Sequence, residues 1–250
     1  FAYEMAATNH NLKREWPKTV VKESRKLKHK NFDIDKVEDL RDKVFVTIDG
    51  KNAKDFDDAV LGEKDEEGNL ILYVAIADVG RYIDIGSNLD QEAYERGTSV
   101  YFSQKVIPML PEELSNDLCS LKPNEDRFCL VCRTTIDAEG NLSDTSFFEA
   151  LINSKSRLTY STVTREIERQ QFKRPYANSL KVLLEIYRRL KRNRLARGSL
   201  ELEVPTYIPK VSNQKILKFE DSPREISHMM IEEFMLAANI SAAQLCLNQK

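Results

Sequence analysis

Four aspartates, Asp49, Asp55, Asp57 and Asp58, lie within ten residues of one another in the segment VFVTIDGKNAKDFDDAV, which begins at Val44. Crowded carboxylates repel one another, which raises their pKa values and opposes the charged folded state unless a cation is bound. A hard divalent ion, Mg²⁺ or Mn²⁺, prefers oxygen ligands of this kind. The cluster therefore predicts a divalent metal site and metal-assisted chemistry.

An ordinary acidic loop is the alternative, because Asp favours turns. Two features favour the metal site: Phe56, Ala59 and Val60 interleave the acids with residues of buried type, and the flanking segments have strand patterns. A calcium-binding loop and a DxD phosphatase motif are both excluded, because each requires an acid where Lys51 stands. The sequence also has no GxSxG, GxxxxGK[ST] or GxGxxG motif.

The strands that flank the acids decide whether the four side chains can meet. Asp49 ends a predicted strand over residues 44–49, and the other three acids open the next strand, over residues 58–63. Neighbouring strands can bring all four side chains to one sheet edge. In an extended chain Asp55 and Asp57 project to one side and Asp58 to the other, so a bend is required for all four to act together.

The rest of the chain alternates between strand and helix patterns. Further strands are predicted at residues 70–79, 100–103, 128–137, 143–153, 201–211 and 215–221. Helices are predicted at residues 87–97, 111–121, 161–172, 178–197 and 228–247. Residues 1–40 are predicted to be a lead-in with one or two helices. The fold class is therefore α+β, with a largely antiparallel sheet and flanking helices.

Composition places limits on the class of protein. The chain has 250 residues, of which 41% are apolar, and it has no run of eighteen apolar residues, so we expect a soluble, intracellular, cytoplasmic protein that does not enter a membrane. The cysteines are too few for a secreted disulfide scaffold, and strand alternation places Cys129 and Cys132 on opposite faces, as reduced core residues. Basic residues gather at 18–30 and 188–197. They fit a bound polyanion, but charge alone favours the alternative of ordinary solvated helix faces.

The segment TIDGKNAKDFDDAV resembles the active-site segment of the ribonuclease II and ribonuclease R family of exoribonucleases. Further segments match in the same order, namely LYVAIADVGRYI, GSNLDQEAYERGTSVYF, VIPMLPEELSNDLCSLKPNEDR, RLTY and HMMIEEFMLAANISAA. GTSVYF followed by VIPMLP is closer to the ribonuclease R branch. The resemblance covers roughly residues 8–250 and implies an RNB-type catalytic domain over residues 41–250.

The resemblance implies hydrolysis of single-stranded RNA from its 3′ end, processively, with release of nucleoside 5′-monophosphates. Asp49, Asp55, Asp57 and Asp58 would be the catalytic residues and would hold Mg²⁺, with Mn²⁺ as an alternative, in a two-metal site. Which aspartate binds which ion is left open.

Three residues match the family's RNA contacts. Tyr101 corresponds to an aromatic residue that stacks on the 3′ base, and a half-buried tyrosine bonded to a neighbour is the alternative. Tyr160 and Glu232 correspond to residues that read the ribose through its 2′-hydroxyl, with Glu233 as a substitute for Glu232. The second wall of the base clamp is a phenylalanine in relatives, whereas this chain has Leu202.

The resemblance also implies parts beyond this sequence. The family's Arg-containing SPIRRY-like segment would follow Lys250, so the chain is expected to be the first two-thirds of a catalytic domain. Cold-shock modules before it and an S1 module after it are expected in the same, monomeric protein. Two other classes of function stay open: a catalytically silent RNA-binding paralogue, and an acidic metal-binding domain without a nucleic-acid ligand.

Overall fold

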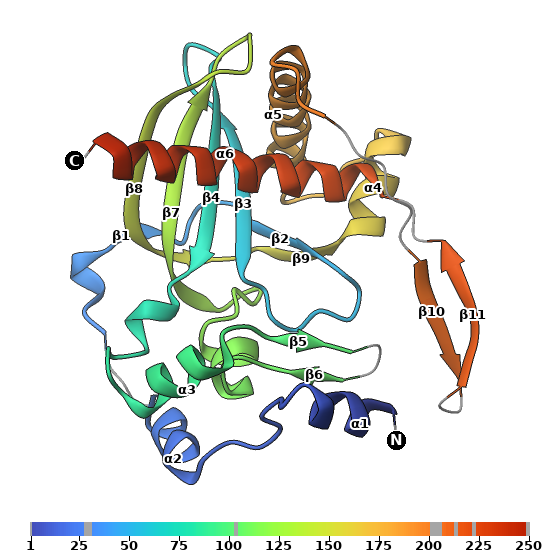
Figure 1. The fold of residues 1–250 in the computed structure, drawn as a ribbon. Coiled ribbons are helices and arrows are strands. Elements are labelled where there is room, and N and C mark those ends of the chain that lie inside the picture. Colours follow the sequence, from blue (N-terminus) through green and yellow to red (C-terminus); the bar gives the residue numbers. More distant parts are fainter. Residues whose placement is uncertain are drawn as a thin grey trace.

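A curled seven-stranded sheet forms the centre of the computed structural model, which describes residues 2–27, 32–102, 105–200, 207–212, 215–221 and 224–248 (Figure 1). The strand order is β1-β8-β7-β4-β3-β2-β9. The bounds of these strands are β1 (Glu38–Leu40), β2 (Val46–Asp49), β3 (Asp58–Lys64), β4 (Leu70–Ala77), β7 (Asp126–Ile136), β8 (Leu142–Asn153) and β9 (Ser156–Thr159). Two separate hairpins are β5 (Val100–Tyr101) with β6 (Val106–Ile107) and β10 (Tyr207–Ser212) with β11 (Lys215–Asp221).

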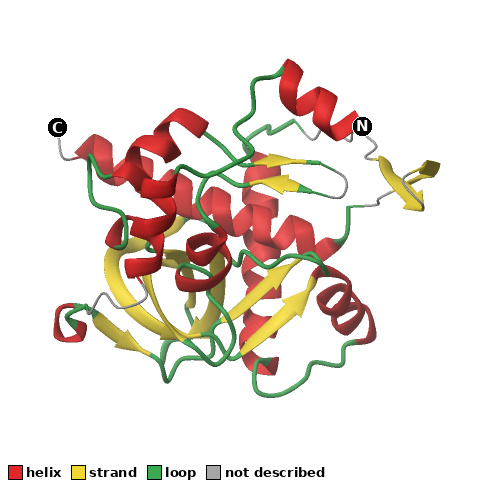
Figure 2. Ribbon diagram, turned by 90° about the horizontal axis from the view of Figure 1, so that it is seen from below, coloured by secondary structure: helices red, strands yellow, loops and turns green. Residues whose placement is uncertain are grey.

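Helices lie on both sides of the sheet. Their bounds are α1 (Ala2–Asn9), α2 (Lys18–Leu27), α3 (Asn88–Arg96), α4 (Tyr160–Arg169), α5 (Ala177–Ala196) and α6 (Ile226–Asn248), with 3₁₀ turns at Ile34–Lys36 and Val79–Arg81. The long helix α6 crosses the strands on one face, and α2 and α3 lie together at the opposite end of the molecule (Figure 1, Figure 2). The α+β prediction is confirmed.

Most strand pairs are antiparallel, as predicted, but β1 runs parallel to β8 and β9 runs parallel to β2. The sequence reasoning missed both of these strands, because they have three and four residues and their partners are distant in the chain. Residues 38–40 therefore belong to the sheet although they fall within the expected lead-in. Val20 and Leu27 of α2 are also buried in the core.

The sheet separates two apolar clusters. One contains Val60, Cys132 and the buried faces of α5 and α6, and the other contains Phe45, Phe56 and Cys129. Cys129 and Cys132 therefore lie on opposite faces of β7 as free thiols, as predicted. Burial raises the pKa of the Cys129 thiol to about 12 and that of Cys132 to about 11, which keeps both thiols protonated.

One predicted helix has a different form. Residues 111–121 were expected to be an ordinary short helix, but the chain forms a π turn at Leu114–Leu118, in which the Cys119 amide donates to the Leu114 carbonyl. The wider turn releases Ser120 and Leu121, which bond the chain around Phe56 instead. The predicted helix at residues 87–97 is confirmed, with Ser87 capping its start and Gly97 ending it.

In the described part of the chain, α6 is the one helix long and apolar enough to cross a membrane. This is weak evidence for a membrane, because core helices of globular proteins pass the same test. Met230, Phe234 and Ala237 of α6 are buried in the core beside α5. Burial against the sheet accounts for these residues, whereas Leu236, Ile240, Leu245 and Leu247 of the same helix are exposed.

Strand β3 and helix α5 approach each other closely at Gly62. A Cβ atom there would lie 2.9 Å from the Leu183 backbone nitrogen and 3.1 Å from the Ser179 carbonyl oxygen. We expect Gly62→Ala to lower the free energy of unfolding by about 2 kcal/mol, because the helix must move away from the strand. Chemical denaturation checks this. Gly80→Ala is the matched control, since its added Cβ would meet only Asp78, at 3.8 Å, and should cost little.

Candidate active site

The four aspartates lie where β2 ends and β3 begins. Strands β2 and β3 are antiparallel neighbours, which places Asp49, the last residue of β2, beside the start of β3 at Asp58. The Ala77 amide donates to the Asp57 carbonyl oxygen at 2.9 Å, so β4 holds the chain just before Asp58. The sheet thus brings the carboxylates to one end of the strands, as the sequence predicted.

Phe56 anchors the acidic segment between Asp55 and Asp57. Its side chain is buried in the core cluster that contains Phe45, while the flanking residues Asp55 and Asp57 are more exposed. The chain from residue 51 to 57 has no regular structure, and β3 begins only at Asp58. One buried aromatic side chain therefore anchors the acidic segment and directs its neighbours away from the core.

The carboxylates form one electrostatically coupled group. Burial, with Asp58 as the strongest acidic neighbour, raises the pKa of Asp49 to about 7, although Arg157 opposes the rise. Burial and then Asp57 raise the pKa of Asp58 to about 6. Desolvation and then Asp55 raise the pKa of Asp57, the most exposed of the four. One carboxylate oxygen of Asp49 is buried without a hydrogen-bond partner in the described part of the chain. Negative charge at this site is thus poorly compensated by the protein.

The chemistry of these donors fits a hard divalent cation. Three carboxylates with raised pKa values, those of Asp49, Asp57 and Asp58, and an unpaired buried oxygen are the groups that such an ion stabilises. Their spacing is a separate matter: among the described residues, no three acidic, histidine or cysteine side chains form a group that could hold a metal ion. The residue types fit Mg²⁺, whereas the side chains as placed do not form a coordination shell.

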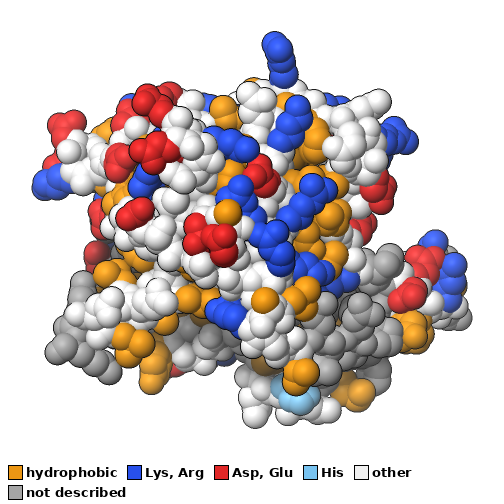
Figure 3. Space-filling model, turned by 90° about the horizontal axis from the view of Figure 1, so that it is seen from above, with side chains coloured by type: hydrophobic (Ala, Val, Ile, Leu, Met, Phe, Trp, Pro, Cys, Tyr) orange, Lys and Arg blue, Asp and Glu red, His pale blue; other side chains and the backbone are white. Residues whose placement is uncertain are grey.

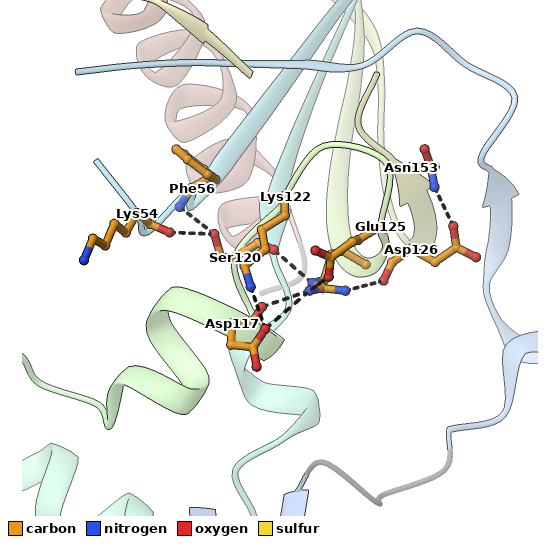
Figure 4. A network of polar contacts seen from close by, with 9 residues as sticks. Lys54, Phe56, Asp117, Ser120, Lys122, Glu125, Asp126 and Asn153 are labelled. Atoms are coloured by element: carbon orange, nitrogen blue, oxygen red, sulfur yellow. Dashed lines mark hydrogen bonds and ion pairs between the residues drawn. The ribbon is translucent and has the colours of Figure 1, made fainter. Parts of the chain in front are cut away.

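Ser120 fixes the acidic segment from the other side (Figure 4). Its buried hydroxyl accepts from the Phe56 amide and donates to the Lys54 carbonyl, both at 3.0 Å. The Leu121 amide donates to the Phe56 carbonyl at 2.9 Å. Arg127 donates to the Ser120 carbonyl and ties this segment to β7. The backbone on both sides of Asp55 is therefore held by the turn that follows the π turn.

We expect Ser120→Ala to lower kcat of a reaction at the acid group about tenfold, because small displacements of positioned groups have large effects on rate. The free energy of unfolding should fall by about 1 to 2 kcal/mol, since the buried Phe56 amide loses its acceptor. Steady-state kinetics and thermal unfolding measure the two effects. Ser146→Ala, at an exposed position of β8, is the control. An unchanged kcat would show that other contacts suffice to place Asp55.

Arg157 is a site residue that the sequence reasoning missed. It lies on β9, and its guanidinium donates to the carbonyl oxygens of Gly50 and Lys51, both at 2.7 Å. It also lowers the pKa of Asp49 against the larger effect of burial. The signal was present in the matching RLTY segment, but only the parallel pairing of β9 with β2 places this arginine at the acidic loop.

Tyr101 lies beside the acids with its ring accessible. Its side chain is 67% exposed, and its hydroxyl donates to an Asp55 carboxylate oxygen at 3.2 Å. Burial of the hydroxyl and then Asp55 raise the pKa of Tyr101. The hydroxyl is bonded to a neighbour, as the alternative interpretation required, but the side chain is not half-buried and its ring stays accessible to a ligand.

Tyr160 begins α4 directly after Thr159, which is paired with Asp49 across β9 and β2. Burial, followed by the Asp49 and Asp58 charges, raises the pKa of its hydroxyl. Both acids therefore act on this tyrosine, and the structure brings it to the same site. Tyr101 and Tyr160 lie far apart in sequence and are coupled to different pairs of the aspartates.

The two glutamates that were alternatives differ in environment. Glu232 is exposed on α6 and pairs with Arg224. Glu233 is buried and accepts from Arg194 on α5 at 2.7 Å, so it links two helices. The accessible candidate is Glu232. Leu202 lies outside the described residues.

The basic segments are only partly available to a ligand. Arg189 and Arg192 on α5 donate to backbone carbonyl oxygens of the turn between β7 and β8, and Arg194 pairs with Glu233. Figure 3 shows Lys and Arg side chains gathered on one face of the molecule, with acidic side chains beside them. Several arginines at residues 188–197 therefore have structural partners. Lys28 and Lys30 of the first segment lie outside the described residues.

Comparison with known proteins identifies relatives. The RNB domain family matches residues 37–250. Ribonuclease R of Vibrio parahaemolyticus is 44% identical over 250 residues, which cover 97% of this chain and 30% of that protein. Two structures of Mycoplasma genitalium RNase R each match 97% of this chain. The complex with ribose-methylated single-stranded RNA has a TM-score of 0.89 and 29% sequence identity, and the match covers 39% of that chain. The complex with double-stranded RNA has a TM-score of 0.90 and 30% sequence identity, and the match covers 44% of that chain. The chain thus spans under a third of the curated relative's length. The match over residues 37–250 shows that this chain belongs to the RNB domain family, with relatives of the ribonuclease R type.

Proposed function

We propose that this chain forms the metal-binding part of a 3′-to-5′ exoribonuclease that hydrolyses single-stranded RNA processively to nucleoside 5′-monophosphates. The observation that carries the proposal is the group of four coupled aspartates beside the exposed ring of Tyr101. This combination provides a place for a cation next to a surface on which a base can stack. Relatives named ribonuclease R, and RNase R structures with bound RNA, support the choice of substrate.

The residues of the chain have separate tasks in this proposal. Asp49, Asp55, Asp57 and Asp58 would hold Mg²⁺, or Mn²⁺, which when bound supplies charge neutralisation at the phosphodiester and lowers the pKa of a water molecule. Tyr101 stacks on the terminal base without regard to its identity. Tyr160 and Glu232 read the 2′-hydroxyl of a ribose near the 3′ end. Ser120 and Arg157 keep the acidic segment in place.

A silent RNA-binding paralogue is the competing function. It has no need for four acids whose charges oppose the binding of a polyanion, and it would be expected to lose at least one of them. The raised pKa values of Asp49 and Asp58 show that the protein alone does not compensate these charges. The acid group therefore favours the enzyme.

The direct test uses the full-length gene product and one RNA labelled at either end. With Mg²⁺, a 5′ label should pass from full-length RNA to a short end product with little accumulation of intermediate lengths, as a processive enzyme requires, and a 3′ label should appear at once as a labelled mononucleotide. Mass spectrometry should identify nucleoside 5′-monophosphates. RNA that is bound but stays intact would support the paralogue, and internal cleavage would exclude an exonuclease.

Replacement of Tyr101 by alanine should raise KM for RNA about 5- to 100-fold, because base stacking contributes about 1 to 3 kcal/mol. Tyr101→Phe should stay within a few-fold of wild type, since it keeps the ring and loses only the bond to Asp55. Initial rates against RNA concentration measure both. If Tyr101→Phe and Tyr101→Ala raised KM equally, the hydroxyl rather than the ring would be the functional group.

A further inference from the structure

Helix α6 contacts the start of α4 at two consecutive residues, Ser227 and His228. The buried Ser227 hydroxyl donates to the Tyr160 carbonyl oxygen at 2.9 Å and shares a second hydrogen bond with the Thr164 hydroxyl, also at 2.9 Å. The His228 ring stacks on the Tyr160 ring, with centroids 3.8 Å apart and planes 23° apart. Backbone and ring of Tyr160 are thus both fixed by α6.

The imidazole acts here as a flat packing surface. Its Nδ1 atom is buried and makes no hydrogen bond within the described residues, so hydrogen bonding through this nitrogen does not explain its position. Burial lowers the pKa of His228, and Glu225 opposes this with a smaller effect. The lowered pKa favours the neutral ring. A neutral ring can be stacked in a partly buried position without leaving an unpaired charge.

The ring that His228 covers belongs to Tyr160, which lies beside the acid group. Tyr160 follows the residue paired with Asp49, and its hydroxyl responds to the charges of Asp49 and Asp58. The stacking on His228 restrains the Tyr160 side chain and so keeps its hydroxyl within the influence of the Asp49 and Asp58 charges. Glu232 lies one helical turn after His228, on the same side of α6.

We infer that His228 is a positioning residue for ribose recognition: by stacking on Tyr160 it holds the tyrosine hydroxyl where a 2′-hydroxyl of the RNA tail is read. The inference rests on the proposed function, in which Tyr160 contacts ribose. It adds a residue that touches neither the acids nor the RNA and acts through the tyrosine. Because Ser227 separately fixes the backbone, loss of the His228 ring should release the tyrosine side chain without unfolding α4.

The test compares two 5′-labelled oligonucleotides in the full-length gene product, one all-ribose and one with 2′-deoxyribose at its four 3′-terminal positions. The readout is the ratio of kcat/KM for the two substrates, together with the unfolding temperature of each variant. Tyr160→Phe should lower the wild-type ratio about tenfold, the effect of one lost hydrogen bond to a positioned group. His228→Ala should lower it to a similar extent, and His228→Phe, which keeps a stacking ring, should retain it.

The double variant Tyr160→Phe with His228→Ala should discriminate no worse than Tyr160→Phe alone, because the histidine acts only through the tyrosine hydroxyl. The inference is wrong if His228→Ala lowers kcat/KM equally for both substrates, or if His228→Phe does not retain the wild-type ratio. It is also wrong if Tyr160→Phe leaves the ratio unchanged, or if the effects of the two substitutions on the ratio add in the double variant. A wild-type protein that degrades neither oligonucleotide would instead refute the proposed function. That result is read from the wild type alone.

Discussion

Asp49→Asn is expected to lower the rate of RNA degradation by about 10³-fold while raising the stability of the protein in the absence of divalent ions. The loss of rate follows from removing one carboxylate of the group proposed to hold the cation. The gain in stability follows from the pKa of Asp49, which burial and Asp58 raise to about 7. A substitution that removes activity and stabilises the fold distinguishes a functional charge from a structural one.

The sign of the stability effect is fixed by linkage. The folded-state pKa of Asp49, about 7, lies above the value of 3.8 expected in an unfolded chain. Well below pH 3.8 the carboxyl is neutral in both states and has no cost. Stability then falls as pH rises toward 7, because the unfolded state ionises first, and at pH 8 the full cost is present. We expect Asp49→Asn to gain about 2 kcal/mol at pH 8, after the cost of an unpaired amide, and little at pH 4.

Thermal unfolding in a chelator at pH 4, 6 and 8 measures this difference. Asp144→Asn is the control, because Asp144 is an exposed residue of β8 remote in sequence from the acid group, and it should show no comparable gain at pH 8. A destabilised Asp49→Asn protein at pH 8 would show that Asp49 contributes a structural interaction. The cation site would then have to be assigned to the other three acids.

Removal of divalent ions should abolish RNA degradation in the wild type, and return of Mg²⁺ or Mn²⁺ should restore it. The same ions should raise the unfolding temperature, since a ligand that binds only the folded state stabilises it. The increase should be larger at pH 8 than at pH 5.5, because protons compete with the cation for Asp49 and Asp58, whose pKa values are about 7 and 6.

Asp58→Asn provides the matched comparison for the ion effect. It should show a much smaller rise in unfolding temperature with Mg²⁺ than the wild type, at equal ionic strength. Calorimetry with Mg²⁺ alone gives the binding constant without reference to activity. A wild type that degrades RNA fully in excess chelator would overturn the metal-dependent proposal while leaving the family assignment intact.

The residues proposed to carry the chemistry could be identified from the sequence because their information is local. Asp49, Asp55, Asp57 and Asp58 lie within ten residues, and apolar runs on either side show that two strands frame them. The strand alternation that separates Cys129 from Cys132 is equally local, and the structure confirms it. The α+β class followed from such patterns, since burial of one strand face or one helix stripe repeats along the chain.

Contacts between distant segments were decided only by the tertiary structure. Arg157 reaches the acidic loop because β9 pairs in parallel with β2, and Ser120 reaches it because a π turn replaces the expected helix. His228 meets Tyr160 through the packing of α6 on α4, and burial rather than sequence separates Glu232 from Glu233. A sequence pattern shows which side chains of a segment face solvent and which face the core. Which distant segments pack together depends on long-range packing energies, which the local pattern does not contain. The sequence alone therefore identified the cluster of acids, and the fold decided which side chains hold that cluster in place.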